Sequence, residues 1–147
     1  MYTKILKWKL IPDNLIEKNF EQIKLLPDVS PYPEYENFRQ YKITDQSLLN
    51  YLQQFFKFNV NDRSFYQIIK DGIVTHIDID RKIIFNYLID AGGNDVHTIW
   101  YKDDKKTENF KIKIPIKIWH CMDVSTYHTV KGITGTRIAI SVFERTK

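Results

Sequence analysis

The sequence predicts an α+β domain, mainly β, in which two N-terminal helices precede an all-β body. Helical spacing of apolar residues is confined to roughly the first 60 residues. After them, short runs rich in Ile, Val, Tyr, Phe and Trp alternate with turn signals such as Asp71-Gly72 and Gly92-Gly93-Asn94. Seven or eight short strands spaced this closely are typical of a sandwich or barrel.

Two helices are expected before the strands begin. Asp13 can cap the first helix, which Pro27 ends, and a loop with Pro31 and Pro33 follows. Asp45 can cap the second. The apolar residues on one face of the first helix are Leu15, Ile16, Phe20 and Ile23, and those of the second are Leu48, Leu49, Leu52, Phe55 and Phe56.

The strands are expected to fill the rest of the chain, and segment 1–10 also alternates like a strand. We place strands near residues 64–70, 73–79, 82–89, 96–102, 107–114, 116–121, 127–131 and 136–144. No repeat, low-complexity segment or linker interrupts the sequence. We therefore interpret residues 1–147 as one domain.

Composition excludes several classes of protein. One cysteine, Cys121, permits no internal disulfide, and no signal peptide or long apolar run is present, so we expect a soluble cytoplasmic protein without a membrane partner. The net charge is +4, and part of it comes from lysines along one expected hairpin: Lys102, Lys105, Lys106, Lys111, Lys113 and Lys117. Lysines are common edge protection on strands, and no nucleic-acid-binding signature accompanies these, so we do not expect a nucleic-acid partner.

The stretch "DGIVTHIDIDRK" places His76, Asp78 and Asp80 at alternate positions. In a strand they would share one face, with Cα atoms two residues apart separated by about 6.6 Å and four apart by about 13 Å. His76 and Asp78 can thus reach one metal ion, whereas Asp80 is too distant unless the chain bends sharply. A solvated outer face is the alternative reading. Arg81 is equally compatible with an inward or a solvent-facing side chain.

The stretch "STYHTVKGITGTRIAISV" contains a second histidine, His128, and an arginine inside an apolar strand, Arg137. A buried guanidinium requires a partner. That partner is either an aspartate of the protein or the carboxylate of a ligand held by the planar fork. His97 and His120 are interpreted as ordinary strand residues.

These pieces together resemble the Fe(II)- and 2-oxoglutarate-dependent oxygenases. The resemblance rests on His-x-Asp, a distant histidine and an arginine on the next strand, over roughly residues 64–144. It implies a double-stranded β-helix (a jelly-roll or cupin-like barrel) supported by the two N-terminal helices. It also implies that His76, Asp78 and His128 bind iron as the catalytic metal and that Arg137 binds the far carboxylate of 2-oxoglutarate.

The implied activity is that of a dioxygenase, an oxidoreductase that couples decarboxylation of 2-oxoglutarate to oxidation of a C–H bond by O₂. The resemblance leaves the reaction open between hydroxylation of a protein side chain, an amino acid or a small metabolite and demethylation of a base. Many family members carry a hydroxyl two residues after the arginine, where this chain has Ala139. Further candidates for contact with the cosubstrate are Ser141, Asn86 and Tyr66.

Two other functions remain open from sequence. A cupin-like metalloprotein of another enzyme class would use the same three ligands without needing Arg137. A non-catalytic jelly-roll binding module would simply pack its histidines. Dependence of activity on 2-oxoglutarate and the metal content of purified protein distinguish these alternatives.

Overall fold

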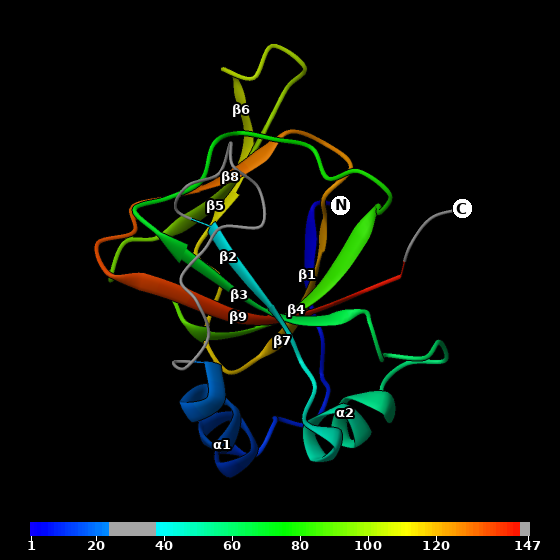
Figure 1. Ribbon diagram of the computed structural model, residues 1–147. Coiled ribbons are helices and arrows are strands. Elements are labelled where there is room, and N and C mark those ends of the chain that lie inside the picture. Colours follow the sequence, from blue (N-terminus) through cyan, green and yellow to red (C-terminus); the bar gives the residue numbers. More distant parts are fainter. Residues whose placement is uncertain (24–37, 145–147) are drawn as a thin grey trace.

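The computed structural model describes residues 1–23 and 38–144, without the side chains of residues 19 and 21–23 (Figure 1). The end of the first expected helix and the loop with Pro31 and Pro33 lie outside these residues. The elements follow in the order β1 (Thr3–Ile5), α1 (Asp13–Ile23), β2 (Phe38–Lys42), α2 (Gln46–Gln53), β3 (Ser64–Lys70), β4 (Ile83–Asp90), β5 (His97–Tyr101), β6 (Glu108–Ile112), β7 (Trp119–Asp123), β8 (His128–Lys131) and β9 (Thr136–Phe143). No helix among the described residues is long and apolar enough to cross a bilayer.

The strands form two antiparallel sheets. The large sheet has the order β1-β7-β4-β9-β3-β2 and the small one β6-β5-β8. From β4 onward the chain moves repeatedly from one sheet to the other, and this alternation is the topology of a jelly roll. The structure therefore confirms the expected mainly β, jelly-roll class with two supporting helices.

Both helices cover one face of the large sheet (Figure 1). Leu48 and Leu52 of α2 are fully buried against that face, together with Trp119 of β7 and Tyr87 of β4. The side chain of Asp45 accepts a hydrogen bond from the backbone N–H of Leu48 at 3.0 Å, so it caps α2 as its position predicts. The helices thus seal the outer face and leave the inner face to meet the small sheet.

Strand register sets which side chains occupy that inner face. His120 of β7 is opposite Asn86 of β4, which is opposite Ser141 of β9. Residues opposite one another in an antiparallel ladder point to the same side. A polar row therefore crosses the large sheet, and Arg137 lies further along β9, opposite Ile69 of β3.

The structure departs from the expected elements in three places. Segment 73–79 is not a strand: its only described pairing is one isolated bridge between His76 and His128. Residues 116–118 form a turn before β7, where Lys117 has a φ of 56°. Residues 38–42 form β2, which we did not expect, because its pairing with β3 supplies order that its own sequence does not show.

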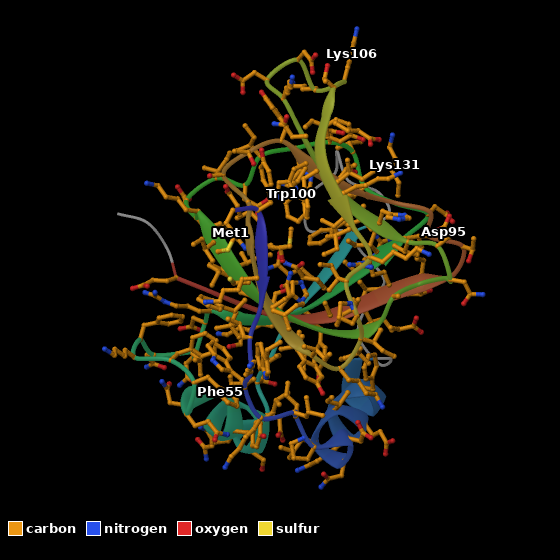
Figure 2. All side chains as sticks on the ribbon, turned by 180° about the vertical axis from the view of Figure 1, so that it is seen from behind. Met1, Phe55, Asp95, Trp100, Lys106 and Lys131 are labelled. Carbon is orange, nitrogen blue, oxygen red and sulfur yellow. The ribbon has the colours of Figure 1, made fainter. Side chains whose placement is uncertain are left out.

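The link between β8 and β9 carries the chain from the small sheet to the large one. Gly132 in this link has a φ of 92°, and a Cβ atom there would collide with the carbonyl of Asp95. The link is therefore held close against the loop before β5. At the opposite end of the small sheet, the β5–β6 hairpin projects outward, with Lys106 at its tip (Figure 2).

Candidate metal centre and cavity

His76, Asp78 and His128 lie together between the two sheets. Their potential ligand atoms are all within 4.8 Å of one another. Oδ1 of Asp78 is 3.3 Å from Nε2 of His76 and 3.5 Å from Nε2 of His128, and the ring centroids of the two histidines are 4.4 Å apart. The predicted set of three thus shares one point, and Asp80 is not part of it.

Backbone hydrogen bonds hold this group in place. His76 and His128 exchange reciprocal N–H···O bonds of 3.0 Å, and the N–H of Asp78 donates to Val124 at 2.9 Å. Nδ1 of His76 lies 2.7 Å from the carbonyl of Val74, and Nδ1 of His128 lies 2.8 Å from that of Thr126. Because a carbonyl only accepts, each Nδ1 carries a proton, and both Nε2 atoms face Asp78, on the side where a metal could bind.

The electrostatics of the three residues are coupled. Burial raises the pKa of Asp78, but hydrogen bonding to His76 and the charges of His128, His76 and Arg81 outweigh it and the pKa falls. Burial lowers the pKa of His76, yet its bonds to Asp78 and Val74 raise it on balance. Burial and the neighbouring His76 lower the pKa of His128. An anionic carboxylate beside a neutral imidazole suits a divalent cation.

The three residues line a cavity of about 510 Å³, within the range of small-molecule sites. Arg137 lines the same cavity and is 7% exposed. Its guanidinium donates to the carbonyl of Ala91 at 3.3 Å and to Oγ1 of Thr98 at 3.5 Å. Among residues 1–23 and 38–144 no carboxylate pairs with it, so the aspartate partner considered from sequence is not found there.

The other three candidate contacts are placed differently. Asn86 lines the cavity, donates to Sδ of Met122 and accepts from the hydroxyl of Ser141. Ser141 is fully buried behind Asn86 and does not line the cavity. Tyr66 does not line it either: it packs in the core beneath the helices, on the opposite face of the large sheet.

Sequence reasoning missed three residues of the cavity wall. Thr98 of β5 contributes the hydroxyl near Arg137, and no motif in the sequence marks it. His120 is 2% exposed and lines the cavity, and its Nδ1 has no hydrogen-bond partner of ordinary geometry. The position of His120 next to Trp119 could have indicated this placement. Neighbouring residues of a strand point to opposite faces, so His120 faces inward if Trp119 faces the helices. Arg81, left undecided from sequence, also lines the cavity.

No family model matches this sequence, and no curated protein is significantly similar to it. Solved structures do resemble it. An oxidoreductase of the 2OG-Fe(II) oxygenase family from Burkholderia pseudomallei aligns with a TM-score of 0.61 and 11% identity, covering 96% of this chain and 84% of the other. Identity this low shows the fold alone. The fold and the cluster define a jelly-roll protein with a candidate His-Asp-His metal centre, built on the architecture of that oxygenase.

Proposed function

We propose that this protein is an Fe(II)- and 2-oxoglutarate-dependent dioxygenase, a hydroxylase whose prime substrate is unknown. The observation that carries the proposal is the content of one cavity. It combines His76, Asp78 and His128, converging on a point, with a buried Arg137 that no carboxylate of the described residues neutralises.

The donor set fits Fe(II). Two neutral imidazoles and one carboxylate are the 2-His-1-carboxylate set of non-haem iron oxygenases, which leaves coordination positions for small ligands. His76, Asp78 and His128 would hold the metal through Nε2, Oδ1 and Nε2. When bound, iron and 2-oxoglutarate supply oxidative decarboxylation coupled to oxygen insertion into a substrate C–H bond.

Arg137 fits the far carboxylate of 2-oxoglutarate. Its planar fork suits a carboxylate, and burial lowers its pKa only to about 10, so it stays charged at neutral pH. Thr98 adds a hydroxyl beside the fork, in place of the one that Ala139 lacks. Asn86, fixed by its bonds to Ser141 and Met122, offers a polar edge on the cavity floor.

An anaerobic titration tests the proposal. Fe(II) and 2-oxoglutarate together are expected to produce a metal-to-ligand charge-transfer absorbance that neither produces alone. The His128→Ala protein should lose this band, whereas His97→Ala, at a half-exposed histidine of β5, should retain it. Absence of the band in wild-type protein with stoichiometric Fe(II) would count against the proposal.

A cupin-like metalloenzyme of another class would keep the iron site but not the need for Arg137. Succinate formation from 2-oxoglutarate under air separates the two. We expect slow formation of succinate even without the prime substrate, and none in the His128→Ala protein.

A further inference from the structure

A second arginine, Arg81, lies in the wall of the same cavity. Its Cζ sits 3.7 Å from the centroid of the Phe143 ring, and its Nε lies 3.7 Å from Oδ2 of Asp78. Nε is buried without a hydrogen-bond partner. Within the described residues we find no hydrogen bond from any nitrogen of this guanidinium.

Such a guanidinium is short of acceptors. Its Nε–H is buried and unpaired, which is unfavourable, whereas its two terminal nitrogens are not fully buried and make no hydrogen bond to the described residues. Asp78 does not satisfy them, because 3.7 Å exceeds hydrogen-bond length and its other oxygen, Oδ1, faces the two histidines. Phe143 attracts the charge of Arg81 through its ring face but accepts no conventional hydrogen bond. The terminal N–H groups of Arg81 are therefore available to an acceptor from outside the chain.

This position differs from that of Arg137. Phe143, on which Arg81 stacks, ends β9, whereas Arg137 lies near its beginning. Phe143 lies six positions after Arg137 along the extended strand, which places about 20 Å between their Cα atoms. The two arginines are thus anchored at opposite ends of the strand, and an anion at one end is distinct from an anion at the other.

The residues around Arg81 indicate the chemical character that the rest of a ligand should have. Ile77 and Ile79 line the cavity yet are 39% and 81% exposed, so apolar surface lies open at the rim. Asp80 also lines it and opposes an anion, but its exposed side chain is screened by water. The rim suits a ligand with an apolar body and one anionic group.

We propose that Arg81 is the subsite for a carboxylate of the prime substrate, held beside the metal centre, with the apolar part of that substrate against Ile77 and Ile79. The proposal rests on the proposed function, since it assumes a prime substrate in addition to 2-oxoglutarate. It narrows the substrate class to small carboxylates with an aliphatic or similarly apolar body.

NMR of arginine Nε–H signals tests the subsite directly, because the chain has only five arginines: Arg39, Arg63, Arg81, Arg137 and Arg145. The protein is loaded with Zn(II), a diamagnetic substitute for iron, and then titrated with 2-oxoglutarate, which should shift the Arg137 signal. Addition of 4-methylpentanoate should next shift the Arg81 signal saturably. The matched amide, 4-methylpentanamide, should leave it unchanged because it has no charge.

Variants provide the second measurement. Arg81→Gln should weaken 4-methylpentanoate binding at least tenfold, the effect of losing charged hydrogen bonds, and Arg81→Lys should weaken it less. Arg63→Gln is the matched control, since Arg63 stacks on Phe58 and does not line the cavity.

Three results would overturn the inference. The first is an Arg81 signal that millimolar carboxylate does not move in protein that binds 2-oxoglutarate, which leaves the proposed function standing. The second is an Arg81→Gln protein that loses Zn(II) affinity but binds carboxylate normally, which would make Arg81 a positioning residue for Asp78. The third is an Arg137 signal that does not respond to 2-oxoglutarate, which removes the proposed function and this inference together.

Discussion

Oδ1 of Asp78 lies 3.5 Å from Nε2 of His128, although the two residues belong to different segments of the fold. Val124 fixes the backbone of Asp78, and the bridge to His76 fixes that of His128. A single carboxylate oxygen therefore faces the Nε2 atoms of both imidazoles before any ion arrives. This preorganisation makes metal affinity the most direct property to measure.

Asp78→Asn is expected to reduce Zn(II) or Co(II) affinity by more than the roughly 10–100-fold typical of losing an outer-shell partner, because an anionic ligand atom is removed. Asp80→Asn, two residues away, should change it little, since Asp80 is outside the cluster. Isothermal titration calorimetry on both proteins measures the contrast. Equal losses would place Asp80 among the ligands.

Arg137→Gln should leave metal affinity unchanged and weaken 2-oxoglutarate binding. The lost charge-assisted contact is worth about 1.5–3 kcal/mol, or roughly 10–150-fold in the dissociation constant. Thr98→Val should give a smaller loss, near 1 kcal/mol, because its hydroxyl is neutral. Competition binding to the Zn(II)-loaded protein measures both, with Arg63→Gln as control. Unchanged affinity in the Arg137→Gln protein would refute the role given to this arginine.

His120 should make folding stability depend on pH. Burial, followed by the positive charge of Arg137, lowers its pKa from 6.5 to about 4, despite a weak opposing effect of the Ile118 carbonyl. Between these two pH values, His120 binds a proton in the unfolded chain but not in the folded protein. The free energy of unfolding therefore falls as the pH drops from 6.5 towards 4. From pH 7 to pH 5 the loss attributable to His120 is about 2 kcal/mol.

Urea unfolding of wild type and His120→Gln at both pH values checks this figure. On acidification, the free energy of unfolding of the variant should fall by about 2 kcal/mol less than that of wild type. His76, His128 and Asp78 contribute equally to both proteins, so their effects cancel in this difference. An identical pH response in wild type and His120→Gln would contradict the buried neutral state of His120.

Leu52→Ala should destabilise the fold by about 2–5 kcal/mol, because Leu52 is fully buried between α2 and the large sheet and its removal leaves a cavity. Leu10→Ala, at a residue that is 56% exposed, should cost far less. Chemical denaturation of the metal-free proteins gives both values. Comparable losses would mean that the helices do not share the core of the sheet.

The class of fold was predictable because its signals are local. Alternation of apolar residues placed β3, β4, β5, β6, β8 and β9 to within a few residues, and Asp45 with the Leu48–Leu52 spacing placed α2. β2 was not predictable, since its order comes from pairing with β3. Segment 73–79 has the alternation of a strand, but its pairing is limited to one isolated bridge between His76 and His128, which alternation alone does not reveal.

Only part of the candidate site was predictable, because some of its residues belong to a sequence pattern and others do not. His76, Asp78, His128 and Arg137 were singled out by an ordered pattern, and the structure brings all four to one cavity. Thr98, His120 and Arg81 belong to no pattern, and their positions depend on how the two sheets face each other. Tyr66 was placed on the wrong face of its strand for a cavity contact, since the sequence shows alternation but not which face meets the helices.

The short crossing at Gly132 has a consequence for the length of molecule that the cavity accommodates. His128 lies on the strand before the crossing and Arg137 on the strand after it. Gly132, between them, packs closely against the backbone of Asp95. The crossing therefore limits how far His128 and Arg137 can move relative to each other. Under the proposed function, a dicarboxylate of another length should fit the pair of contacts less well than 2-oxoglutarate.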